Sequence, residues 1–154
     1  MPALPVLTLE LLKISATDFA RSLGATPIPA LYGVTDGKAV GTYVEAALHT
    51  YLATLFDHTP GNAAKGIDLP DLGVDIKVTS IRQPQSSCPF RDATQKIYGL
   101  GYNLLVFVYD KADDDALRSA RLDFKYVLFI DESLTGDFQP TDRVAADIEQ
   151  WWER

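Results

Sequence analysis

Apolar residues recur at helical spacing in two segments of the first half of the chain. From residue 39 to residue 56 they fall three and four positions apart, which predicts one long amphipathic helix. Residues 8–23 predict one or two shorter helices that end at Gly24, before a loop rich in Pro and Gly. Glu45 follows the apolar Val44 by about 100° around the helix axis, so we expect its carboxylate at the edge of the apolar stripe.

The pattern changes to short apolar and alternating runs in the middle of the chain. Residues 67–69 and 74–81 predict a strand pair joined by a turn at residues 70–73. In the second strand Asp75 and Lys77 alternate with apolar neighbours, so both charged side chains should lie on one face and the apolar set on the other. The alternation therefore makes these two charged groups neighbours.

The second half of the chain predicts further strands and two helices. Residues 103–109 are nearly all apolar, which is typical of a strand covered on both faces, and another strand is expected at about residues 122–130. A short helix is expected at residues 92–98, and a closing helix is expected to begin at Thr141. This order of elements predicts an α/β fold, with a mixed central β-sheet flanked by helices.

Length and composition limit the number of domains and the compartment. With 154 residues, 47% of them hydrophobic, the chain can bury one core but hardly two. We expect a single domain, with residues 1–36 as an N-terminal helical and loop segment and 37–154 as the core, either complete or part of a longer protein. The single Cys88 has no partner for an internal disulfide, and neither a leader nor a long apolar run is evident, which favours the cytoplasm.

The charge balance restricts how the protein can meet nucleic acid. A net charge of -7 argues against a protein that coats DNA through a broad positive surface. Residues 77–98, however, contain four cations and only Asp92 as an acid, which is compatible with a local positive groove. The acidic run at residues 113–115 is more typical of solvated surface than of a metal site. His49 and His58 lack a neighbouring Cys, so zinc binding is not expected, and His49 is expected on the helix surface.

Asp68 and Asp75, on adjoining predicted strands, are candidate ligands for a hard cation. Hydrolysis of a phosphodiester requires a nucleophile made from water and stabilisation of charge on the phosphate, and Mg²⁺ serves both needs. One or two carboxylates usually hold Mg²⁺, while water and substrate phosphate complete its octahedron. Lys77 is expected close to the attacking water or to the developing negative charge. Such a pair of aspartates is chemically sufficient for metal-dependent hydrolysis, in which Mn²⁺ is expected to be able to replace Mg²⁺.

The run Gly-Ile-Asp-Leu-Pro-Asp-Leu-Gly-Val-Asp-Ile-Lys at residues 66–77 resembles the catalytic hairpin of the PD-(D/E)XK nucleases, in particular MutH and related type II restriction endonucleases. Residues 38–45 are similar to the helix whose Glu belongs to the active site of that family. The resemblance implies a Mg²⁺-dependent endonuclease acting on double-stranded DNA, with Glu45, Asp68, Asp75 and Lys77 as catalytic residues and the three acids as metal ligands.

The segment after the predicted catalytic strand is a candidate for DNA contacts. Arg and Gln side chains can pair with base edges, and Ser can contact phosphate. An ordinary surface loop is an equally good interpretation of the same residues. The candidates are Arg82, Gln83, Gln85 and Ser86, together with Lys96 on the following short helix.

Three hypotheses follow. The first is an endonuclease of a restriction system that cuts duplex DNA, as a homodimer if both strands are cut together. The second, favoured by the acidic net charge, is a catalytically inactive nuclease-like module that binds DNA or a protein. In the third, the acids merely decorate a surface hairpin, and their carboxylates should then point apart.

Overall fold

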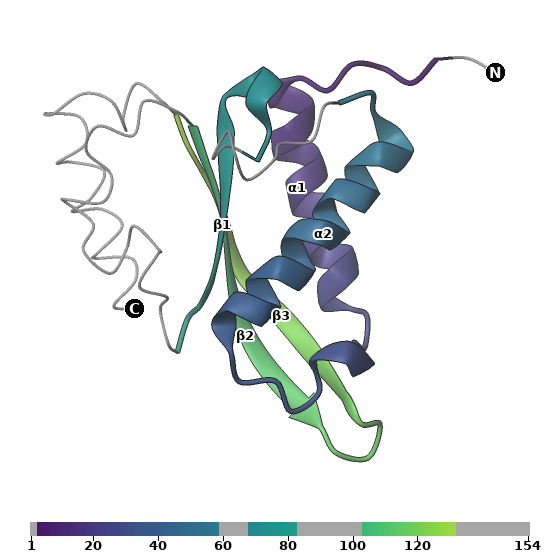
Figure 1. The fold of residues 1–154 in the computed structure, drawn as a ribbon, viewed down its shortest axis with the longest axis vertical. Coiled ribbons are helices and arrows are strands. Elements are labelled where there is room, and N and C mark those ends of the chain that lie inside the picture. The colour runs from purple at the N-terminus through teal and green to yellow at the C-terminus, as the bar shows by residue number, and fades with distance from the viewer. Residues whose placement is uncertain (1–2, 59–67, 83–102, 132–154) are drawn as a thin grey trace, which may run out of the picture.

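A three-stranded mixed sheet forms the centre of the molecule, and two helices cover one of its faces (Figure 1). The structure is a computed structural model that describes residues 3–58, 68–82 and 103–131. Strand β1 (Val74–Ser80) pairs in parallel with β2 (Asn103–Asp114), and β2 pairs antiparallel with β3 (Ser119–Ile130). This arrangement confirms the predicted α/β class with a mixed sheet and flanking helices.

Both long helices begin at a side-chain cap. Helix α1 (Leu9–Gly24) starts after Thr8, whose hydroxyl accepts a hydrogen bond from the Leu11 N–H at 3.2 Å, and it is one helix rather than two. Helix α2 (Gly37–Leu55) starts after Asp36, whose carboxylate accepts from the Lys38 N–H at 3.0 Å. Such caps satisfy N–H groups that the first helical turn leaves without partners. Between the helices lies one short 3₁₀ turn, η1 (Pro29–Leu31).

The core lies between the helices and the sheet face that they cover. Helix α2 packs closely on β1 at Gly41. A Cβ atom added at this glycine would be in ordinary van der Waals contact with the Val78 side chain. Burial of each Leu, Ile, Val or Phe side chain contributes about 1.5–3 kcal/mol, so this layer holds the helices against the sheet. Its fully buried members include Leu12 from α1, Val44, Leu48 and Leu52 from α2, and Val74, Ile76, Leu105, Phe107 and Leu122 from the sheet.

The predicted pairing of two strands around residues 67–81 is wrong in its first half. Residue 67 lies outside the described residues, and Leu69 makes only an isolated bridge to Val74, with hydrogen bonds of 2.9 and 3.2 Å between their backbones. A 3₁₀ turn, η2 (Pro70–Leu72), and a left-handed Gly73 with φ of 62° connect the two. The sheet neighbour of β1 is therefore β2, from much further along the chain.

The β2–β3 hairpin is longer than the sequence pattern predicts. It continues beyond the apolar stretch to its tip, where residues 113–115 are exposed as expected of solvated acids. A β-bulge at Val108 and Tyr109 interrupts the register of the two strands. The predicted helices at 92–98 and from Thr141 lie outside the described residues. None of the helices in the described part of the chain has the length and apolar character needed to span a membrane.

Candidate active site

Asp75 and Lys77 lie side by side on β1, on the face predicted from their alternation. The Lys77 Nζ is 3.0 Å from Asp75 Oδ2, and the side chains are 31% and 8% exposed. Their register partners on β2 are Leu104 and Val106, which are fully buried, so the ion pair borders an apolar surface. A charge pair in such surroundings is screened less by water than one on an open surface.

Asp68, the residue before the Leu69–Val74 bridge, lies at the edge of β1 that faces away from β2. Its Oδ2 accepts a hydrogen bond from the Ile76 N–H at 2.8 Å, a donor that points away from β2. A side-chain oxygen thus takes the place that a backbone carbonyl of a neighbouring strand would have. The carboxyl groups of Asp68 and Asp75 also lie close enough to interact through a side-chain hydrogen bond, which favours the protonated form of Asp68.

The raised pKa of Asp68 has clear physical causes. Burial and the hydrogen bond with Asp75 raise the pKa of Asp68 to about 7, against the opposing effect of the Ile76 N–H. The negative charges of Asp75 and Glu45 raise this pKa further. Like charges this close cannot all ionise without compensation, and a bound cation would supply that compensation.

Glu45 reaches this cluster from α2, one helical turn after the close approach at Gly41. It is half-buried, and burial raises its pKa, followed by the charge of Asp75, while the charge of Lys77 lowers it. These effects mean that the carboxylate of Glu45 lies within electrostatic reach of both β1 residues. The structure therefore brings together all four predicted catalytic residues, three through direct contacts and Glu45 through its charge.

The donor set fits a hard divalent cation held by few protein ligands. Within residues 3–58, 68–82 and 103–131, no three His, Cys, Asp or Glu side chains form a ready-made metal cage. Mg²⁺ does not require one, because it usually binds through one or two carboxylates and keeps several waters. Asp68 and Asp75 bring two carboxyl groups together at one edge of the sheet, a donor set that would suit such a cation, and the charge of Glu45 acts on Asp68 as well.

Of the predicted DNA-contacting residues, only Arg82 is described. Its guanidinium pairs with Asp110 through two contacts, Nε to Oδ1 at 2.6 Å and Nη2 to Oδ2 at 3.2 Å, and its side chain is 73% exposed. Because Arg82 pairs with Asp110, the positive charge that was predicted to contact DNA is already balanced within the protein. Gln83, Gln85, Ser86 and Lys96 lie outside the described residues.

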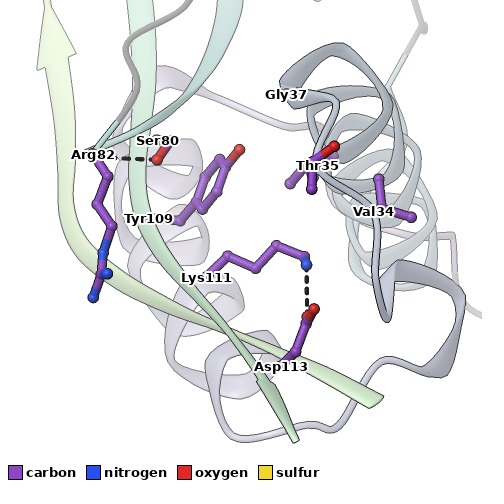
Figure 2. A pocket seen from close by; sticks show the side chains of 9 residues that line it. Val34, Thr35, Gly37, Ser80, Arg82, Tyr109, Lys111 and Asp113 are labelled. Atoms are coloured by element: carbon purple, nitrogen blue, oxygen red, sulfur yellow. Dashed lines mark hydrogen bonds and ion pairs between the residues drawn. The ribbon is translucent and has the colours of Figure 1, made fainter. Parts of the chain in front are cut away.

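A pocket of about 280 Å³ lies near Arg82, at the C-terminal end of β1 (Figure 2). Tyr109 and Thr35 line its walls, and Lys111 reaches across to Asp113, with Nζ 2.6 Å from Oδ1. Asp75 lies near the opposite end of the same strand, so this pocket is separate from the acidic cluster. Both cations that line the pocket are paired with acids, Arg82 with Asp110 and Lys111 with Asp113, so the lining offers a phosphate little uncompensated positive charge.

His49 is not on the helix surface, contrary to the expectation from sequence. It is half-buried, and its ring lies parallel to that of His58, with centroids 5.9 Å apart and an interplanar angle of 8°. Burial and the nearby His58 lower the pKa of His49. In the described part of the chain, His49 Nδ1 and His58 Nε2 are buried without a hydrogen-bond partner. Sequence spacing could not reveal this contact, because it depends on how the chain turns after α2.

Comparison with known proteins gives two matches. Residues 6–151 match the protein family described as Type II restriction enzyme NspV. Over 136 residues the chain is 53% identical to the type II restriction enzyme NspV of Nostoc sp. (strain ATCC 29411 / PCC 7524), an alignment that covers 88% of this chain and 62% of that enzyme. The chain therefore spans less than two thirds of the length of this relative. No solved structure matches the chain.

Proposed function

Because this chain belongs to the family of the type II restriction enzyme NspV, we propose that it contains the catalytic centre of a metal-dependent endonuclease that hydrolyses phosphodiester bonds in duplex DNA. The observation that carries the proposal is the contact of Asp68 with Asp75 beside the Lys77 ammonium. Membership of this family supports the proposed reaction, and the contacts among these three residues support their proposed catalytic roles.

Asp68 and Asp75 are the proposed ligands of Mg²⁺, for which Mn²⁺ can substitute. Restriction enzymes of this type generally need a divalent metal ion, which when bound polarises phosphate oxygens and makes water a better nucleophile. Lys77 orients the attacking water or stabilises negative charge that develops on the phosphate. Glu45 adds charge to the metal site and helps to hold the ammonium of Lys77 in place.

The raised pKa of Asp68 makes metal binding dependent on pH. Asp68 must lose its proton to become a full ligand, and its pKa is raised to about 7 in the metal-free protein. Metal binding therefore releases this proton, so affinity should rise as the pH increases through about 7.

A plasmid cleavage assay with Asp75→Asn tests the proposal. Asparagine keeps the shape of the side chain but removes the charge that pairs with Lys77, so cleavage in MgCl₂ should be lost while the protein stays folded. The matched control is Asp123→Asn, because Asp123 forms the same kind of pair with Lys125 on β3, with Oδ2 2.6 Å from Nζ. Undiminished cleavage by Asp75→Asn would refute the assignment of the site.

The alternative is a nuclease-like module that binds DNA or a protein without cutting. The net charge of -7 favours this function, as does the pairing of Arg82 with Asp110. Calorimetry separates the two, because a folded chain that binds neither Mg²⁺ nor Mn²⁺ would support the binding module. For the endonuclease we propose a homodimer, since simultaneous cleavage of both strands needs two centres, and analytical ultracentrifugation would test it.

A further inference from the structure

The turn between Asp68 and Asp75 sets the separation of the two carboxylates. Asp68 directly precedes the bridge between Leu69 and Val74, and Asp75 directly follows it. Within the turn, the Leu72 N–H donates to Leu69 O and the Gly73 N–H donates to Pro70 O, both at 3.2 Å. These bonds close the turn on itself, and the Leu69–Val74 bridge joins it to β1, but none of them links the turn to β2.

Asn103, the first residue of β2, ties this turn to the sheet through two hydrogen bonds. Its backbone N–H donates to Gly73 O at 2.7 Å, and its side-chain Nδ2 donates to Leu72 O at 3.2 Å. The residue is 3% exposed, and its register partner on β1 is Val74. One buried residue thus holds two successive carbonyls at the point where the turn becomes the strand that bears Asp75.

The side-chain bond depends on the chemistry of asparagine. The carbonyls at the end of a short helix have no partners within that helix, so they need donors from elsewhere. The Gly73 carbonyl receives its donor from the backbone of β2, whereas the Leu72 carbonyl receives one from the Asn103 side chain. Leucine has a similar volume but no donor, and a serine hydroxyl is too short to span the same distance. Neither can replace the amide.

We propose that Asn103 is a positioning residue that fixes the spacing of Asp68 and Asp75 for a divalent cation. The inference rests on the proposed metal-dependent nuclease function and adds a residue that the sequence pattern did not single out. Mg²⁺ demands near-ideal octahedral geometry, whereas Ca²⁺ accepts longer and more variable ligand distances. A turn released from β2 should therefore impair Mg²⁺ binding more than Ca²⁺ binding.

The test is calorimetric titration of MgCl₂ and of CaCl₂ into the full chain without DNA. For Asn103→Leu we expect Mg²⁺ affinity to fall about tenfold to a hundredfold, the usual cost of losing a residue that orients a metal ligand, with a smaller loss for Ca²⁺. If the leucine variant does not fold, Asn103→Ser replaces it in the test, because serine shortens the donor without adding apolar bulk. Its affinity should again fall more for Mg²⁺ than for Ca²⁺.

A destabilised control separates positioning from general loss of stability. Val108→Ala removes buried volume from the same strand, five residues after Asn103, and should lower the melting temperature without changing Mg²⁺ affinity. Wild-type Mg²⁺ affinity in both Asn103 variants would overturn the inference, as would equal losses for Mg²⁺ and Ca²⁺ that Val108→Ala reproduces. If Asp75→Asn abolishes binding while the Asn103 variants keep it, the nuclease site stands and only the positioning role fails. If the wild-type chain binds neither ion, both proposals fail.

Discussion

Two Asp-x-Lys pairs of identical spacing lie in the same sheet, but their surroundings differ. In β1 the Lys77 Nζ is 3.0 Å from Asp75 Oδ2, and in β3 the Lys125 Nζ is 2.6 Å from Asp123 Oδ2. The β1 aspartate is 8% exposed and the β3 aspartate 62%. The contact distance alone would rank the β3 pair as the stronger one.

What distinguishes the β1 pair is a second carboxyl group in a poorly hydrated place. Asp68 hydrogen-bonds to Asp75, and Glu45 adds its charge from α2. Crowded acids out of water favour the binding of a cation, whereas an exposed ion pair has little energetic consequence because water screens it. An Asp-x-Lys pattern therefore indicates a metal site only where the fold brings further acids close to it.

The largest expected difference between the two pairs is in cleavage rate. Lys77→Met should lower the rate of plasmid cleavage about 10²–10³-fold, because a positive group near the reacting phosphate is removed. Lys125→Met removes the matching cation from β3 and should leave the rate unchanged. Equal losses in the two variants would mean that the β1 pair has no special role.

The next difference is in stabilisation by metal. At a Mg²⁺ concentration of one hundred times Kd, binding to the native state should add about 2.7 kcal/mol to the free energy of unfolding, seen as a higher Tm. Asp75→Asn should abolish this rise, and Asp123→Asn should keep it. A rise that persists in Asp75→Asn would place the bound ion elsewhere.

A smaller effect is expected on the pH dependence of metal-free stability. The ordinary pKa of an aspartate is 3.8, and burial and its neighbours raise the pKa of Asp68 to about 7 in the folded chain, so the folded state binds more protons between these values. Its contribution to stability is therefore complete below about pH 4 and is lost as the pH rises through about 7. Asp68→Asn mimics the protonated form, so it should unfold at a higher temperature than wild type at pH 8 in EDTA. Identical pH profiles of Tm for the two proteins would contradict the raised pKa.

The smallest effect concerns the β3 pair itself. Lys125→Ala breaks an ion pair whose members are 43% and 62% exposed, so no measurable change in Tm is expected in physiological salt. Differential scanning calorimetry of wild type and variant in the same buffer would test this. A clear loss of stability would show that the exposed pair contributes more than its surroundings suggest.

The amino-acid sequence alone located the two long helices, the central parts of the three strands and the face of β1 on which its charged residues lie. Helical spacing of apolar residues located α2, and alternation put Asp75 and Lys77 side by side, because both patterns follow from the local geometry of the backbone. The resemblance of residues 66–77 to a nuclease hairpin also proposed Asp68 as their neighbour, and the resemblance of residues 38–45 to the family's helix proposed Glu45. These signals come from residues close together in the sequence, so they do not depend on contacts with the rest of the chain.

The contacts that bring Asp68 close to Asp75 depend on the tertiary structure. The Leu69–Val74 bridge and the hydrogen bond from the Ile76 N–H to the Asp68 carboxylate hold this segment at β1 instead of a regular strand. Asn103, from a distant part of the sequence, donates a hydrogen bond to the turn. The stacking of His49 on His58 is likewise set by the path of the chain after α2. Burial and long-range contacts create these features, since desolvation and hydrogen-bond partners depend on residues that are distant in the sequence.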